Sequence, residues 1–107
     1  MTRKEIHALD RWVFPKVRAQ GKCDRCGSHR ALQVSHLYSR RYLGIRWHPR
    51  NLTVKCAACH WWYRDNPIDG AKWVQEFLGK EKFAHLKSLR DALRKDLTVE
   101  EVKGWWI

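Results

Sequence analysis

The sequence has no long apolar stretch, no repeats and no low-complexity tracts. None of its hydrophobic runs reaches the roughly 20 residues that a membrane-spanning helix needs. Its first residues, MTRKEIHALDRW, are too charged for a secretory signal peptide. We therefore expect a soluble, cytoplasmic protein with no membrane partner. At 107 residues the chain has the length of one domain. The hydrophobic core of such a domain is small and often needs a bound metal or a disulfide to stabilise it.

Acidic residues are scarce in the first part of the chain. Residues 1–64 contain fourteen lysines and arginines but three acids, whereas residues 65–107 contain eight of each. The formal net charge of +11 therefore comes from the first part. A localised positive charge favours a polyanion, because neutralising phosphates releases counterions and gives sequence-independent affinity. We expect nucleic acid as the partner, and a generally basic surface is the alternative.

A capping-box pattern marks the start of the first helix. Thr2 and Glu5 form this pattern. Four apolar residues follow it at helical spacing: Ile6, Leu9, Val13 and Val17. Together they predict a helix over residues 3–20, bent or interrupted at Pro15 because proline removes a backbone donor.

Short strands and a loop are expected in the middle of the chain. The segment ALQVSH predicts a strand that runs into His36, and NLTVKC predicts a second strand that ends at Cys56. Between them lies a long basic loop, with some strand expected at residues 43–47. A short helix is expected over residues 57–64.

Helix signals dominate the last part of the chain. Asn66 and Pro67 provide a cap and a first-turn proline, so a helix is expected over residues 67–78. Five apolar residues then predict a third long helix: Phe83, Leu86, Leu89, Leu93 and Leu97. Thr98, with Glu101 three positions later, signals a final helix.

Four cysteines form two Cys-x-x-Cys pairs, Cys23 with Cys26 and Cys56 with Cys59. Both pairs have the spacing of zinc knuckles, and each can place two thiolates on one tetrahedral ion. Disulfides are the alternative, and they would require an oxidising compartment. We expect a structural four-cysteine zinc site, which contributes directly to folding and leaves no open position for catalysis.

Three polar residues lie beside the cysteines. His36 ends the first strand, Asn51 precedes the second, and His60 follows Cys59. Because the cysteine pairs hold both ends of this segment, we expect the three side chains to converge on one phosphate-sized site. A metal-dependent nuclease needs an imidazole to deprotonate water, a polar residue to orient it and a ligand for a divalent ion. Taken singly, each residue also has a structural explanation, as a core histidine, a turn asparagine or a partner of a thiolate.

These motifs resemble the HNH endonucleases, the ββα-metal nucleases built on a treble-clef zinc scaffold. The resemblance runs from about Cys23 to Tyr63 and rests on CDRC, LQVSHLY and HPRNLTVKCAACH, which occur in the family's order. The segments SHLYSRR, RWHPRN, CAACH and NPIDGAKWVQEFLGKEKF also resemble phage-encoded HNH proteins of the NinG recombination type. That wider similarity extends to about residue 90.

The resemblance implies a catalytic role for each of the three polar residues. His36 would be the general base that activates the attacking water, and Asn51 would hold that histidine or its loop in place. His60 would bind the catalytic divalent ion, such as Mg²⁺, Mn²⁺ or Ni²⁺, at the scissile phosphate. Ser35 stands where the family often has Asp or His as a second metal ligand. A hydroxyl is a weak ligand, so a loosely held ion and an inactive site are the alternatives.

Basic side chains in and beside the loop are the expected DNA contacts: Arg40, Arg41, Arg46, Arg50, Lys55 and Arg64. Arginine reaches a phosphate through a bidentate fork, and contacts to the backbone are largely independent of sequence. Aromatic residues between them, such as Tyr38 and Trp47, can pack along sugars or stack on splayed bases. Core packing is expected for five tryptophans: Trp61, Trp62, Trp73, Trp105 and Trp106.

The predicted fold is an α+β, zinc-stapled treble-clef ββα-metal core with flanking helices. Residues 1–22 would form an N-terminal helix, residues 23–64 the zinc-bound core and residues 65–107 the C-terminal helices of one HNH nuclease domain. The predicted function is metal-dependent hydrolysis of DNA phosphodiester bonds, in duplex or branched DNA, during phage recombination or DNA processing. Two alternatives stay open. One is a zinc-dependent DNA-binding protein without catalysis, and the other is a recombination or packaging accessory that docks a phage protein or forms a homodimer.

Overall fold

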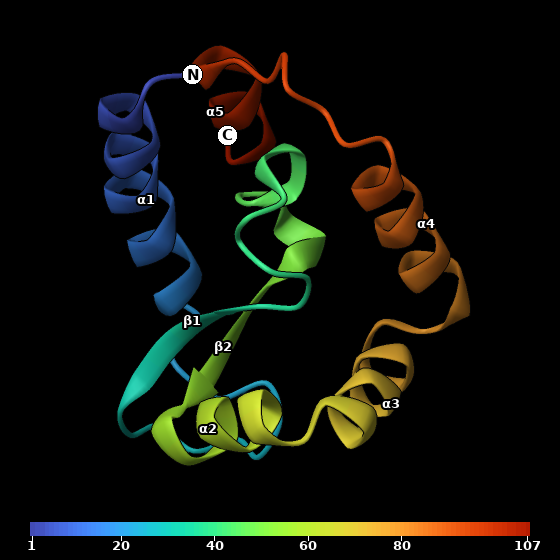
Figure 1. Ribbon diagram of the computed structural model, residues 1–107. Coiled ribbons are helices and arrows are strands. Elements are labelled where there is room, and N and C mark those ends of the chain that lie inside the picture. Colours follow the sequence, from blue (N-terminus) through green and yellow to red (C-terminus); the bar gives the residue numbers. More distant parts are fainter.

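Five α-helices and a two-stranded antiparallel sheet form an α+β fold, and the computed structural model describes all 107 residues (Figure 1). In chain order the elements are α1 (Arg3–Arg18), β1 (Leu32–His36), β2 (Leu52–Cys56), α2 (Ala57–Asp65), α3 (Pro67–Leu78), α4 (Lys80–Asp91) and α5 (Val99–Trp105). Two short 3₁₀ helices, Leu43–Ile45 and Pro49–Asn51, lie between the strands. None of the helices combines the length and the apolar composition of a membrane span.

Helix α1 begins at the predicted capping box. The Glu5 N–H donates to the Thr2 hydroxyl at 3.1 Å, and the Thr2 N–H donates to the Glu5 carboxylate at 2.8 Å. The helix is not interrupted at Pro15, as the sequence had suggested, but continues past it. Pro15 removes one backbone donor, yet Val13 and Val17 are buried on either side of it and hold the helix against the core.

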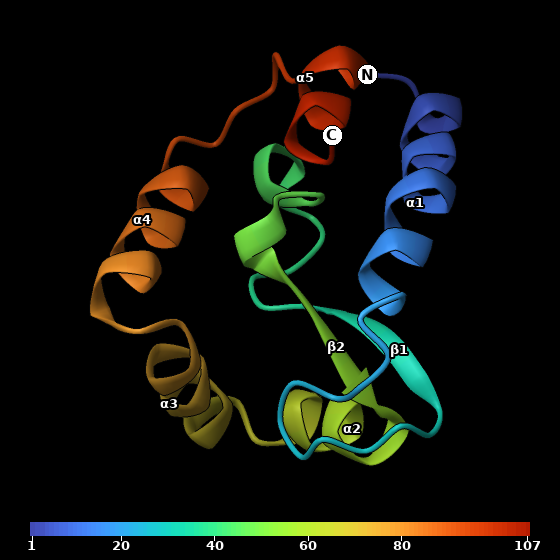
Figure 2. The ribbon, with the colours of Figure 1, turned by 180° about the vertical axis from the view of Figure 1, so that it is seen from behind.

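The two strands lie between α1 on one side and α3 and α4 on the other (Figures 1 and 2). Val34 of β1 is opposite Val54 of β2, and His36 is opposite Leu52. The first core lies mainly between α1, β2 and α5: Leu9, Val13, Val17, Trp47, Leu52, Val54, Leu97 and Val102. The second core joins the loop after β1 to α3 and α4: Leu37, Ile45, Val74 and Leu86. Because Val34 packs on the first core and Leu37 belongs to the second, His36 lies where the two cores meet.

The basic loop between the strands contains no strand, so the strand expected at residues 43–47 is wrong. Residues Leu43–Ile45 form a 3₁₀ turn instead. The fully buried Asn51 binds the backbone of this loop at Tyr38 and Ile45. These bonds hold the loop in a compact turn. A strand at residues 43–47 would be too extended to make them.

Helix α4 ends at Asp91, so the third helix is shorter than its apolar pattern predicted. The apolar residues beyond it belong to the other core. Leu86 is buried in the second core, whereas Leu97 is buried in the first, beside α1 and α5. The chain changes direction at Leu93, which has a φ of 47°. A continuous helix would keep these leucines near one helix face and could not deliver them to two cores.

Helix α5 closes the end of the molecule that lies opposite α2, beside the N-terminus (Figure 2). Trp106 Nε1 donates to the Trp47 carbonyl oxygen at 2.7 Å. Arg94 Nη2 donates to the Glu101 carboxylate at 2.9 Å and ties the α4–α5 connection to α5. The C-terminal helix therefore packs onto the loop that carries Trp47.

Candidate functional site

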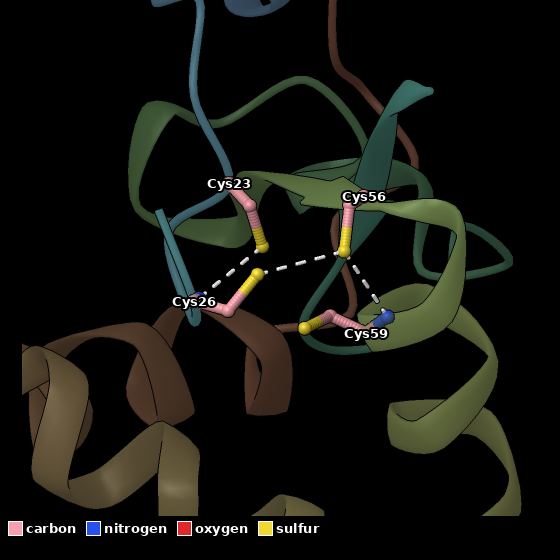
Figure 3. Close-up of side chains that lie close together, drawn as sticks. All are labelled: Cys23, Cys26, Cys56 and Cys59. Carbon is pink, nitrogen blue, oxygen red and sulfur yellow. Dashed lines mark hydrogen bonds between the residues drawn. The ribbon is translucent and has the colours of Figure 1, made fainter. Parts of the chain in front are cut away.

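The four cysteines come together between the segment that precedes β1 and the start of α2 (Figure 3). Their sulfur atoms all lie within 4.8 Å of one another, and none forms a disulfide. The Sγ atoms of Cys26 and Cys56 are 3.7 Å apart, so the two pairs meet at one point. The four cysteines are therefore close enough to hold one metal ion, and four thiolates are a donor set of structural zinc sites.

Backbone N–H groups point at these sulfur atoms. The N–H groups of Arg25 and Cys26 donate to Cys23 Sγ at 3.4 and 3.5 Å, and the Cys59 N–H donates to Cys56 Sγ at 3.4 Å. Burial raises the pKa of the Cys23 thiol, but hydrogen bonds outweigh this effect and lower its pKa overall. Burial raises the pKa of Cys59. A cation among the sulfurs would favour the thiolate at all four positions.

A cavity of about 1020 Å³ runs along β1. Every residue from Leu32 to Arg40 lines it, so it follows the edge of β1 that β2 leaves free. The other walls come from α1, α2, α3 and the first turn of α4. Three arginines line it, Arg18, Arg40 and Arg64, and no aspartate or glutamate does. The charge of the cavity therefore favours an anion.

His36 lies in this cavity at the end of β1. Its Nε2 is 3.0 Å from the carbonyl oxygen of Arg46. Because a carbonyl oxygen can only accept, Nε2 carries the ring proton and Nδ1 keeps its lone pair. Burial lowers the pKa of His36 to about 4, so the imidazole is neutral at pH 7. A neutral imidazole with a free lone pair is the form that a general base requires.

Asp10 of α1 holds the segment that orients His36. Its carboxylate accepts from Arg46 Nη2 at 2.6 Å and from Trp47 Nε1 at 2.8 Å. Burial opposes ionisation of Asp10, but these two donors lower its pKa overall. Only 15% of the Arg46 side chain is exposed, and its charge is neutralised by Asp10. The prediction that Arg46 binds DNA is therefore wrong, and its observed role is to anchor the loop.

Asn51 holds the loop that follows His36. Its side chain is fully buried and does not line the cavity. Oδ1 accepts from the Tyr38 N–H at 2.7 Å, and Nδ2 donates to the carbonyl oxygens of Tyr38 and Ile45, each at 3.1 Å. These bonds are those of a residue that positions the loop, and they keep Asn51 away from any molecule in the cavity.

His60 lines the same cavity from α2. Its Nδ1 is 2.5 Å from Oε1 of Gln33, a residue that the sequence analysis did not single out. An amide oxygen accepts, so Nδ1 carries the proton and Nε2 keeps a lone pair. Burial lowers the pKa of His60. Gln33 is near the start of β1 and His36 is at its end, so the two histidines face different stretches of one cavity and do not converge on one point.

Ser35 and Lys55 form a buried polar cluster on the face of β1 opposite His36. Lys55 Nζ donates to Ser35 Oγ at 3.0 Å and to Thr53 Oγ1 at 2.7 Å, and it lies 4.4 Å and 4.7 Å from the ring centres of Tyr63 and Trp73. Burial lowers the pKa of Lys55 to about 8, so it is mostly protonated at pH 7. An ammonium bound to its hydroxyl repels a metal cation, and this contact argues against Ser35 as a metal ligand. Lys55 is fully buried, so its predicted DNA contact is wrong.

The remaining predicted DNA contacts differ in their surroundings. Arg40, Arg41 and Arg64 are exposed. Arg40 and Arg64 line the cavity, and Arg41 lines a neighbouring groove beside α4. Arg50 is half-buried and its guanidinium contacts His85 of α4, away from the cavity.

Several residues of the cavity escaped the sequence analysis, among them Phe14, Arg18 and Phe83. The four-residue spacing of Phe14 and Arg18 places them on one face of α1, and this is a signal that the sequence contains. Phe83 gave no such signal, because α4 reaches the cavity from a distant part of the chain. The core packing expected for Trp61 is wrong, since 61% of this residue is exposed.

The site is thus a four-sulfur cluster beside an anion-attracting cavity that contains two histidines. The cavity walls bring together residues from five elements, and the sulfur cluster joins the segment between α1 and β1 to the junction of β2 and α2. No protein-family model, no curated protein and no solved structure matches this chain.

Proposed function

We propose that this protein is an HNH-type nuclease that hydrolyses DNA phosphodiester bonds, with His36 as the general base. One observation carries the proposal. His36 and His60 line a single cavity together with Arg18, Arg40 and Arg64, and no acidic residue lies among them. A phosphodiester is attracted to such a cavity, and a neutral imidazole there has a free nitrogen to accept a proton.

The proposed reaction uses His36 to activate water. Nδ1 accepts a proton from water, the water oxygen attacks the phosphorus, and the bond from phosphorus to the 3′ oxygen breaks. The proton ends on the imidazole, and the leaving 3′ oxygen takes a proton from solvent. Asn51 and Asp10 are positioning residues. Asn51 holds the loop that follows His36, and Asp10 holds Arg46, whose carbonyl oxygen orients the His36 ring.

The order of elements supports a treble-clef arrangement. A cysteine pair precedes β1, the second strand ends at Cys56, and α2 carries Cys59 and His60. We propose zinc as the ion in the sulfur cluster, because four thiolates match its preferred tetrahedral donor set. The zinc would hold α2 against the segment that precedes β1 and would take no part in the reaction, since a closed site has no open position.

A catalytic divalent ion does not fit the ligand pair that the resemblance implied. Ser35 also lines the cavity, but its hydroxyl accepts a hydrogen bond from the ammonium of Lys55, so His60 is left as the single predicted ligand without a cation bound to it. Beyond the four cysteines, no three His, Cys, Asp or Glu side chains lie close enough to share an ion. The proposed reaction therefore contains no step at a divalent ion.

A second candidate function is DNA binding without catalysis, and the Lys55–Ser35 contact favours it. In this alternative the cavity and the exposed arginines hold DNA, and His36 and His60 serve as neutral polar contacts. The proposed setting, phage recombination or DNA processing in the host cytoplasm with a homodimer or a phage protein as partner, rests on the sequence resemblance alone.

A plasmid-nicking assay separates the two functions. The zinc-loaded protein is incubated with supercoiled DNA in magnesium, manganese, nickel or EDTA, and the His36→Ala variant is compared with it at equal zinc content. We expect wild type to nick in at least one condition and the variant to bind equally well but cut at least about a hundred-fold more slowly, as for loss of a general base. The matched control is His7→Ala, which removes an exposed histidine of α1.

Two results would contradict the nuclease. Equal cutting by wild type and His36→Ala would assign the activity to another group or to a contaminant. Salt-sensitive binding with no cutting in any condition would establish the binding protein instead.

A further inference from the structure

We infer that the cavity along β1 receives an unpaired stretch of a DNA strand and not an intact duplex. The inference rests on the proposed function, because it names the substrate of the same site. It is drawn from three properties of the cavity: the depth of His36, the aromatic walls and the distribution of charge.

The position of His36 limits what can reach it. The imidazole is partly buried, its Nε2 is engaged by the Arg46 carbonyl, and the edge of the Phe14 ring lies against it at a centroid separation of 5.6 Å. A phosphodiester must therefore enter the cavity to meet Nδ1. At about 1020 Å³ the cavity has the size of a pocket for a few nucleotide units. A duplex carries a second strand and a stacked base column, which would have to enter with it.

Aromatic side chains supply surface for bases that have lost their stacking partners. Phe14, Tyr38, Tyr63 and Phe83 line the cavity, and each comes from a different segment of the chain. All four are partly exposed, so part of each remains accessible. Bases in a duplex already stack on their neighbours and gain nothing from such rings. Bases of a single strand stack on aromatic side chains with about 1–3 kcal/mol each.

The charge pattern suits a strand that lies along β1. Arg40 ends the segment 32–40 that lines the cavity, four residues after β1, whereas Arg18 and Arg64 come from α1 and α2. All three are exposed, and Arg64 is the one of them that forms an ion pair, with Asp65 at 3.7 Å. A basic groove with aromatic residues in its walls is a common arrangement in proteins that bind single strands without sequence preference.

Binding of labelled oligonucleotides tests the inference. The zinc-loaded full chain, without added divalent ions, is titrated with a fluorescent single strand of about 20 nucleotides and with the duplex of the same sequence. We expect the single strand to bind at least about ten-fold more tightly. Phe83→Leu and Phe14→Leu keep apolar volume but remove a ring, and each should weaken single-strand binding about five-fold and change duplex binding less than two-fold.

The matched control is Trp61→Leu, which removes an exposed aromatic ring of α2 that does not line the cavity. It should leave both affinities unchanged, and thermal melting should show that all three variants are folded. Duplex binding as tight as single-strand binding would overturn the inference, as would two folded ring variants with unaltered single-strand affinity.

The outcomes for the two proposals are distinct. Single-strand preference, with no cutting of either the plasmid or the single strand in any of the metal conditions, would overturn the nuclease and leave the inference standing. His36-dependent cutting of duplex plasmid, with no preference for single strands, would overturn the inference and leave the nuclease standing.

Discussion

At the scale of single residues, access to the cavity decides which histidine can act as a base. His36 and His48 both have a pKa lowered to about 4 by burial, so both are neutral at pH 7. Only His36 lines the cavity, whereas His48 Nδ1 accepts from the Arg50 N–H and its ring packs on Trp105. A neutral imidazole is therefore available for a reaction at His36, whereas at His48 it helps to pack the loop.

The pKa of His36 predicts the pH dependence of cleavage. A general base acts in its unprotonated form, and a pKa of about 4 lies below the ordinary 6.5, so the active form persists as the pH falls through 6.5. We expect kcat/KM to change less than two-fold between pH 7.5 and 5.5. A base with the ordinary pKa would lose about ten-fold over this range.

The measurement is the initial rate of cleavage at low substrate concentration, with zinc content determined at each pH because acid protonates thiolates. A ten-fold fall in rate between pH 7.5 and 5.5 at constant zinc content would show that the base is not the buried His36.

At the scale of elements, the contact between α2 and α3 supports one wall of the cavity. Tyr63 of α2 donates its hydroxyl to the Leu37 carbonyl oxygen at 2.6 Å, which fixes the ring. Gly70 of α3 is buried against it. A Cβ at position 70 would lie 3.0 Å from the Tyr63 ring and 3.4 Å from the Tyr63 carbonyl oxygen. The absence of a side chain at Gly70 allows the two helices to approach.

The substitution Gly70→Ala tests this contact. Because the Tyr63 ring is held by its hydroxyl, the added methyl group forces the helices apart, and we expect a loss of about 1–3 kcal/mol in the free energy of unfolding. Chemical denaturation of the zinc-loaded protein measures it. The control is Gly104→Ala in α5, where nothing lies within 4 Å of the added carbon.

A helical alanine loses less conformational entropy than a glycine, so the control should be neutral or stabilising by up to about 1 kcal/mol. Equal effects of the two substitutions would contradict the close approach of α2 and α3.

At the scale of the whole molecule, the sulfur cluster joins segments that are far apart in the sequence. It links the Cys23 segment to the β2–α2 junction, and Asp24 adds two bonds beside it. The Asp24 N–H donates to the Val54 carbonyl oxygen at 2.7 Å, and the Val54 N–H donates to the Asp24 carboxylate at 2.8 Å. The hydrophobic cores are small, so this link is important for the fold.

Removal of the metal should therefore unfold the protein. We expect one zinc per chain, and we expect a strong chelator or the Cys56→Ser substitution to abolish the cooperative thermal transition, since zinc binding supplies on the order of 10 kcal/mol in small zinc domains. Circular dichroism and metal analysis measure both effects, and added zinc should restore the chelated wild type. An unchanged thermal midpoint in metal-free protein would contradict a structural metal.

The local elements were largely predictable, and the departures have a common origin. The capping box, both strands, the short helix after the cysteines and the helix after Asn66 appear close to their expected bounds. The strand expected at 43–47 failed because Asn51 draws the loop inward, and the third helix ended early because Leu97 is needed in the other core. Neither the Asn51 bonds nor the packing of Leu97 in the first core can be recognised from residues that are neighbours in the chain.

The sequence by itself determined the elements, the pairing of the cysteines in two knuckles and the concentration of positive charge, because these depend on nearby residues and on composition. Only the tertiary structure decided what surrounds each polar residue of β1. Successive residues of a strand point to opposite faces, so His36 meets the Arg46 carbonyl oxygen on one face while Ser35 meets the ammonium of Lys55 on the other. Both side chains are polar in the sequence, and their surroundings come from elements that only folding brings together.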